Sequence, residues 1–141
     1  MHDLNLVPTV ENTFPNIVCI DDDLDVSWAI ELRLKEFKVN VFRTYYGVQG
    51  FWETMRVKPQ LIITDNRMPQ GNGDYVVECL KRNPDTQNIP IIVYSGQSDT
   101  SLKQRMLGLG VNKFITKPVE FTELQGEIET IIELQPRLDF F

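Results

Sequence analysis

The chain has 141 residues, 42% of them hydrophobic and 24% charged, and its formal net charge at pH 7 is -6. This length and apolar content fit one domain with a substantial core. The acidic balance argues against direct binding of nucleic acid, because contact with phosphates requires Lys and Arg clustered on one surface.

Residues 1–15 contain two prolines and scattered apolar residues that follow neither a helical nor a strand period. We interpret them as an N-terminal extension outside the fold. The single histidine, His2, lies in this extension without a second metal-ligand type at suitable spacing, so we assign it no function. We expect one domain over residues 16–135 and a short C-terminal tail over residues 136–141.

From residue 16 onward, short apolar runs alternate with segments of helical periodicity, which is typical of a parallel sheet with crossover helices. The expected strands lie near residues 16–21, 39–43, 60–65, 89–94 and 112–116. The expected helices lie near residues 25–37, 46–56, 74–83, 98–108 and 120–134. The pattern therefore predicts an α/β fold with five parallel strands and five helices.

Helical spacing also predicts which side chains face the sheet. In the first helix, which has Asp23 or Asp25 available as its N-cap, the inward residues are Val26, Ile30, Leu34 and Phe37. In the second helix they are Val48, Phe51, Trp52 and Met55. The fourth helix has few apolar residues to bury, namely Leu102, Met106 and Leu107. We therefore expect the fourth helix to be the least firmly held.

Two apolar residues of the first helix, Trp28 and Leu32, lie one turn apart and nearly opposite its inward stripe. We expect them to stay outside the core. Three explanations are open: they are ordinary surface residues, the N-terminal extension covers them, or a partner docks on them.

Polar and charged residues follow four of the expected strands. In chain order they are Asp21-Asp22-Asp23, then Asp65, then Ser95-Gly96, then Lys117-Pro118. Because the carboxyl ends of parallel strands meet at one edge of a sheet, these residues should share one site. Crowded carboxylates repel one another unless a cation binds or their pKa values rise, and Mg²⁺ suits an all-oxygen site.

These residue types fit the transfer of a phosphoryl group to a carboxylate. Asp65 would be the nucleophile, Lys117 the cation on the phosphoryl oxygens, and Ser95 the hydroxyl donor. Each feature alone also has an ordinary explanation. The acidic run would then be a solvated helix start, Ser95 a turn residue, and Lys117 an exposed lysine before a proline.

Taken together, the ordered set resembles the receiver domain of two-component response regulators. The matching motifs are Ile20-Asp21-Asp22, Asp65-x-x-Met68-Pro69-x-x-x-Gly73, Ser95-Gly96 and Lys117-Pro118. The resemblance covers about residues 16–135. It implies a flavodoxin-like, doubly wound sheet with strand order 2-1-3-4-5.

The resemblance also implies a role for each matching residue. Asp65 would accept the phosphoryl group, while Lys117 and Ser95 would contact its oxygens. The groups implied to bind Mg²⁺ are Asp21, Asp22, Asp65 and the backbone carbonyl of Arg67. Ser95 and Phe114 would form the conformational switch, and the Lys117-Pro118 peptide would be cis.

The chain departs from the family pattern at a few positions. Arg67 and Gln97 stand two residues beyond Asp65 and Ser95, where this family carries residues that influence the lifetime of the phosphoryl group. Their pairing does not predict a lifetime. Phe114 stands where the family carries Tyr, and its lack of a hydroxyl group favours the buried rotamer.

The resemblance implies a signalling switch, not an enzyme that acts on other molecules. Its expected partners are a histidine kinase or phosphotransfer domain and an unknown downstream protein bound by the fourth helix, fifth strand and fifth helix. One alternative is an aspartate-nucleophile phosphohydrolase, a class marked by a DxD motif after the first strand. The other is a degenerate receiver used only for docking. A flavodoxin is disfavoured, because three aspartates would repel the phosphate of its FMN.

Cys19 and Cys79 fall in an expected strand and helix, so we interpret them as core thiols of a reducing compartment. No apolar run reaches about 18 residues, and the N-terminus lacks the pattern of a signal peptide. We therefore expect a cytoplasmic protein that does not contact membranes. The apolar end of the tail, residues 138–141, leaves open whether the chain is a piece of a longer protein.

Overall fold

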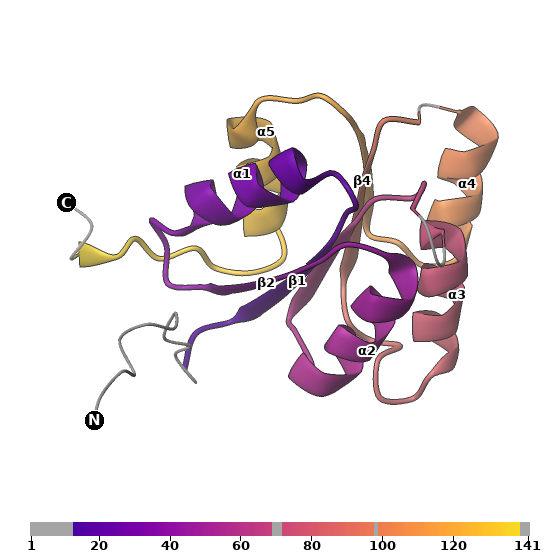
Figure 1. Cartoon of the computed structure of the whole chain (residues 1–141), viewed down its shortest axis with the longest axis horizontal. Coiled ribbons are helices and arrows are strands. Elements are labelled where there is room, and N and C mark those ends of the chain that lie inside the picture. Colours follow the sequence, from indigo (N-terminus) through magenta and orange to yellow (C-terminus); the bar gives the residue numbers. More distant parts are fainter. Residues whose placement is uncertain (1–12, 69–71, 98, 139–141) are drawn as a thin grey trace.

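The computed structural model describes residues 13–68, 72–97 and 99–138, in which five strands form one parallel sheet (Figure 1). The strands are β1 (Asn16–Ile20), β2 (Asn40–Thr44), β3 (Leu61–Thr64), β4 (Ile91–Ser95) and β5 (Lys113–Thr116). Their order across the sheet is β2-β1-β3-β4-β5. This result confirms the predicted fold class and strand order.

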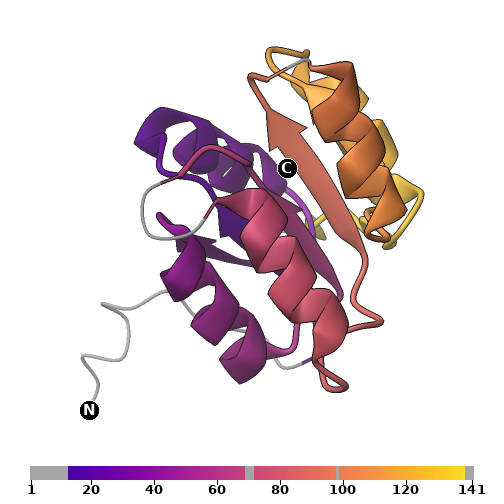
Figure 2. The same ribbon diagram turned by 90° about the vertical axis from the view of Figure 1, so that its right-hand side faces the viewer.

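Five helices cover the two faces of the sheet. They are α1 (Leu24–Leu34), α2 (Gly47–Val57), α3 (Gly73–Arg82), α4 (Thr100–Gly108) and α5 (Phe121–Glu129). Helices α1 and α5 lie on one face, and α2, α3 and α4 lie on the other (Figures 1 and 2). Alternate strand residues belong to the two core clusters, as with Ile62 and Ile63 of β3. Among the helices described, none has both the length and the apolarity that a membrane span requires.

Helix α1 follows the predicted pattern. Ile30 and Leu34 are buried, and the Asp23 side chain caps the helix by accepting hydrogen bonds from the N–H groups of the second and third residues after it. Trp28 and Leu32 are 54% and 44% exposed, so the prediction that they stay outside the core is confirmed. Their possible contact with residues 1–12 lies outside the part of the chain that the structure describes.

The prediction for α2 is only partly confirmed, because Phe51 packs half-buried on the core while Val48 and Trp52 are exposed and small residues are buried instead. The buried residues of α2 are Gly47, Gly50 and Thr54. A Cβ atom added at Gly50 would lie 2.5 Å from Ile20 Cδ1, so this close packing on β1 requires glycine. Trp52 is 64% exposed and, with Phe51, lines a surface groove between α2 and α3.

The predictions for α4 are partly confirmed. Asp99 is its N-cap, and its side chain accepts from the N–H groups of Ser101 and Leu102. Leu102 and Met106 are buried as expected, whereas Leu107 is 42% exposed. Two side chains of this helix are therefore buried, the same number as in α5, so the weaker hold of α4 stays a prediction.

Helix α5 is shorter than predicted and ends at Glu129 instead of residue 134. A run of β-branched residues, Thr130-Ile131-Ile132, follows it, and such residues disfavour helix. The chain then returns beside the connection between α1 and β2, where Lys38 N–H donates to the Gln135 carbonyl at 2.8 Å. Ile132 and Leu134 are buried in the α1–α5 core from this non-helical segment.

Candidate functional site

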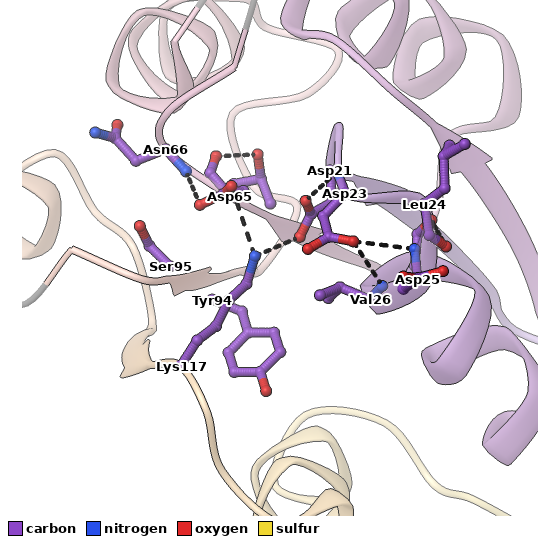
Figure 3. A network of polar contacts seen from close by, with 12 residues as sticks. Asp21, Asp23, Leu24, Asp25, Val26, Asp65, Asn66, Tyr94, Ser95 and Lys117 are labelled. Atoms are coloured by element: carbon purple, nitrogen blue, oxygen red, sulfur yellow. Dashed lines mark hydrogen bonds and ion pairs between the residues drawn. The ribbon is translucent and has the colours of Figure 1, made fainter.

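Four strands deliver side chains to the carboxyl edge of the sheet (Figure 3). Asp21 follows β1, Asp65 follows β3, Ser95 ends β4 and Lys117 follows β5. The backbone pairing continues beyond the strands: Asp65 N–H donates to the Ile20 carbonyl at 2.8 Å, and Lys117 N–H to the Ser95 carbonyl at 2.8 Å. The sheet itself therefore brings these predicted residues together.

Three carboxylates meet at this edge. Oxygen atoms of Asp21, Asp22 and Asp65 lie within 4.8 Å of one another. Asp21 and Asp65 are only 4% and 8% exposed, whereas Asp22 is exposed to solvent. A set of carboxylate oxygens without nitrogen or sulfur ligands fits a hard cation such as Mg²⁺.

Lys117 is the cation among these acids. Its Nζ lies 2.8 Å from Asp21 Oδ2 and 3.6 Å from Asp65 Oδ2, and its side chain is 16% exposed. Burial alone would lower the pKa of Lys117, but the hydrogen bond to Asp21 and the charges of Asp21 and Asp65 raise it overall. Lys117 therefore stays charged at neutral pH.

For Asp21, in contrast, the surroundings on balance disfavour the charged form. Burial raises the pKa of Asp21, and the hydrogen bonds from Lys117 and from the backbone N–H of Asp23 offset this only in part. One lysine thus faces three carboxylates, which leaves excess negative charge at the edge. A bound divalent cation would neutralise it.

The described residues on either side of the gap at 69–71 lie close to Asp65. Asn66 N–H donates to Asp65 Oδ1 at 2.7 Å, and Gly73 N–H donates to the Asn66 carbonyl at 2.6 Å. A Cβ atom at Gly73 would lie 2.4 Å from the Asp65 carbonyl oxygen, so the motif glycine is required for this close approach of α3. The side chain of Arg67 is exposed.

The two residues assigned to the switch lie on β4 and β5. Ser95 is fully buried, and its Oγ accepts a hydrogen bond from Gln97 N–H at 3.2 Å. Phe114 pairs with Val93 across the strands and packs, half-buried, on the core beneath α2, α3 and α4. The peptide between Lys117 and Pro118 is cis, in agreement with the resemblance.

Two residues of the site were not predicted. Tyr94 lies beside Lys117, with the ring centroid 5.5 Å from Nζ, and its hydroxyl oxygen accepts a long 3.5 Å hydrogen bond from Val119 N–H. Its position directly before Ser95 in the strand was the available signal. Asn66 connects several parts of the site by hydrogen bonds, and an amide next to Asp65 was the corresponding signal.

Comparison with known proteins agrees with this geometry, since the model of the family described as "Response regulator receiver domain" matches residues 17–129. The chain belongs to this family. Response regulator ArlR of Staphylococcus haemolyticus is 32% identical over 124 residues, which make up 88% of this chain and 55% of ArlR. Hybrid signal transduction histidine kinase D of Dictyostelium discoideum is 28% identical over 126 residues, or 89% of this chain and 8% of the kinase.

The receiver domain thus spans about half the length of ArlR and a small part of the hybrid kinase. Solved structures show the same fold. A putative response regulator from Chloroflexus aurantiacus superposes with a TM-score of 0.78 at 26% identity, covering 84% of this chain and 98% of that one. Chemotaxis response regulator CheY4 of Vibrio cholerae gives a TM-score of 0.79 at 18% identity, covering 85% and 100%.

Membership of this family settles the class of function. Receiver domains are signalling switches, not conventional enzymes, and they interact with histidine kinases or phosphotransfer domains. They bind Mg²⁺ at an acidic pocket, and this chain has an acidic cluster formed by Asp21, Asp22 and Asp65. The phosphohydrolase and flavodoxin alternatives are therefore set aside.

Proposed function

We propose that this receiver domain, over residues 16–135, accepts a phosphoryl group on Asp65 from a histidine kinase or phosphotransfer domain. The supporting observation is the place of the Asp65 carboxylate, which lies 3.6 Å from Lys117 Nζ and within 4.8 Å of oxygens of both Asp21 and Asp22. Asp21 is less suited to be the nucleophile, because its carboxylate already bonds to Lys117 at 2.8 Å.

In the proposed step, an Asp65 carboxylate oxygen forms a bond to phosphorus while the bond between phosphorus and the donor breaks. The donor leaves with the electron pair. Lys117 stabilises negative charge on the phosphoryl oxygens, and the Ser95 hydroxyl donates a hydrogen bond to one of them. Asp21, Asp22, Asp65 and the Arg67 carbonyl would hold Mg²⁺, which when bound offsets the negative charge of the carboxylates and the phosphoryl group.

Phosphorylation would then change the conformation of the chain through Ser95 and Phe114. Drawing Ser95 toward the phosphoryl group opens space that Phe114 enters, and α4 moves with them. The surface of α4, β5 and α5 would carry the signal to a downstream protein. We also propose a cytoplasmic location, because both cysteines of the described residues are free thiols.

Acetyl phosphate with Mg²⁺, followed by intact-mass measurement, tests this function. We expect the mass of one phosphoryl group to be added to the natural chain and none to Asp65→Asn. Asp85→Asn, a change at an exposed aspartate after α3, is the matched control and should be phosphorylated normally. A natural chain that gains no phosphoryl group would support the alternative of a degenerate receiver used only for docking.

A further inference from the structure

Asn66 forms hydrogen bonds to three parts of the site and is only 7% exposed. Its backbone N–H donates to Asp65 Oδ1 at 2.7 Å, while its side-chain Oδ1 accepts from the backbone N–H of Asp74, the second residue of α3, at 2.9 Å. Its Nδ2 donates to Gln97 Oε1 at 2.7 Å. Figure 3 shows the amide group directed away from the Asp65 carboxylate, so the side chain connects the site to elements beyond it.

The contact with Gln97 is not needed to begin α3. The first N–H groups of a helix lack partners within the helix, and the Oδ1 of Asn66 supplies one for Asp74. Capping of α3 therefore explains the hydrogen bond that Asn66 Oδ1 accepts, but it does not explain the bond that Asn66 Nδ2 donates to Gln97. Gln97 lies 31 residues later in the chain and is half-buried, so the bond joins the end of β3 to the segment after β4.

Gln97 is also held by its backbone. Its N–H donates to Ser95 Oγ at 3.2 Å. Gln97 therefore bonds to Ser95 through its backbone and to Asn66 through its side chain. When the Ser95 hydroxyl turns toward a phosphoryl group on Asp65, its oxygen moves and the Gln97 N–H loses this acceptor. Any shift of Gln97 that compensates for the loss strains the bond to Asn66.

We propose that Asn66 is a positioning residue for phosphorylation and that its bond to Gln97 holds Ser95 in the resting position. This inference rests on the function proposed for Asp65. A bond made only in the resting state stabilises that state, so its loss raises the population of molecules whose Ser95 is free to contact the phosphoryl group. Asn66 thereby lowers the rate of phosphorylation at the residue beside it.

Gln97→Met tests the bond selectively, because Met keeps the shape of the side chain and lacks the acceptor, while the bond from Asn66 to Asp74 remains. With subsaturating acetyl phosphate and Mg²⁺, we expect Asp65 to be phosphorylated about three- to tenfold faster, the range that follows from losing one net hydrogen bond. Gln104→Met, on the exposed surface of α4, is the matched control and should keep the natural rate.

A double-mutant cycle with Asn66→Ala separates this role from a merely structural one. If the bond is the cause, Gln97→Met accelerates the natural chain but has no further effect in the Asn66→Ala background. An equal acceleration in both backgrounds, or a natural rate for Gln97→Met, overturns the inference while the proposed function stands. A natural chain that is not phosphorylated at all overturns the proposed function and this inference with it.

Discussion

The two edges of the sheet are built from the same strands but are stabilised in different ways. At the amino edge, neutral amide side chains satisfy the strand ends: Asn16 N–H donates to Gln60 Oε1 at 2.6 Å, and Ile91 N–H donates to Asn112 Oδ1 at 3.1 Å. At the carboxyl edge, three carboxylates cluster, those of Asp21, Asp22 and Asp65, and Lys117 lies against Asp21 and Asp65.

This contrast shows how one sheet separates stability from function. The amino edge also holds the C-terminal segment, whose Arg137 guanidinium lies 5.2 Å from the Phe14 ring centroid. This guanidinium also donates a hydrogen bond to the Phe37 carbonyl at 3.1 Å, so it is held by an aromatic ring and a backbone group. The carboxyl edge keeps excess negative charge at two buried carboxylates, which costs stability until a cation binds there.

Removing the cation of the carboxyl edge should have the largest effect. Lys117→Met leaves the phosphoryl oxygens without their positive partner, and we expect phosphorylation by acetyl phosphate to slow by about 10²- to 10³-fold. Lys113→Met is the matched control, since Lys113 lies on β5 but pairs with Glu127 on the outer surface. A variant of Lys117 that folds normally and reacts at the natural rate would refute the role of this residue.

A core substitution near the amino edge should lower the stability of the chain without changing its rate of phosphorylation. Leu134 is 7% exposed in the core between α1 and α5, so Leu134→Ala should lower the free energy of unfolding by about 2–3 kcal/mol. Urea denaturation measures this loss, with the exposed Glu133→Ala as control. Phosphorylation of the folded fraction should proceed at the natural rate, and a slowed rate would show that the two edges are coupled.

Magnesium should stabilise the chain through the carboxyl edge. At about ten times its dissociation constant, Mg²⁺ bound only by the folded state should add about 1.4 kcal/mol to the free energy of unfolding. Asp65→Asn should raise the stability of the metal-free chain, because it removes one of the crowded charges. If neither Mg²⁺ nor this substitution raises the Tm, the acids do not interact as the structure indicates.

The effect of Asp21 on stability should depend on pH in a defined direction. The pKa of Asp21 is raised in the folded state, so the folded chain binds this proton more tightly than the unfolded chain does. Without metal, Asp21 contributes favourably to the free energy of unfolding below about pH 3.9, its pKa in the unfolded chain. This contribution is lost as the pH rises through the higher pKa of Asp21 in the folded chain. The stabilisation by Mg²⁺, which requires ionised Asp21, should grow over the same range, and Asp21→Asn should abolish both trends.

The smallest effect is expected on the outer surface of α1. Trp28 is 54% exposed and contributes to neither edge, so Trp28→Ala should change the free energy of unfolding by no more than about 0.5 kcal/mol. Deleting residues 1–13 is the companion experiment. If the deletion shifts the fluorescence of Trp28 to the red and lowers stability, the N-terminal extension covers this residue.

The residues of the carboxyl edge were predictable because parallel strands end at one edge, which brings Asp21, Asp65, Ser95 and Lys117 together regardless of the helices between them. The buried face of α2 was not predictable from apolar spacing. Phe51 and Trp52 both fit the apolar spacing, but the close approach to Ile20 requires Gly50, and Trp52 is left exposed. The spacing records which residues share a side without recording how near the helix comes to the sheet.

The same limit applies to contacts between distant segments. The bond from Asn66 to Gln97 depends on the positions of two loops that share no sequence pattern. The path of the chain after α5 was missed for the same reason, because it runs to a contact in which Lys38 N–H donates to the distant Gln135 carbonyl. Such partners become visible only when the fold places them side by side.

The identity of the phosphorylated side chain tests the difference between the two edges most directly. Borohydride reduces a phosphorylated aspartate to homoserine, which peptide mapping locates after treatment with acetyl phosphate and Mg²⁺. We predict homoserine at position 65 alone, because that carboxylate is the nucleophile while Asp21 and Asp22 hold the metal. Homoserine at Asp21 or Asp22, with Asp65 unmodified, would contradict this assignment.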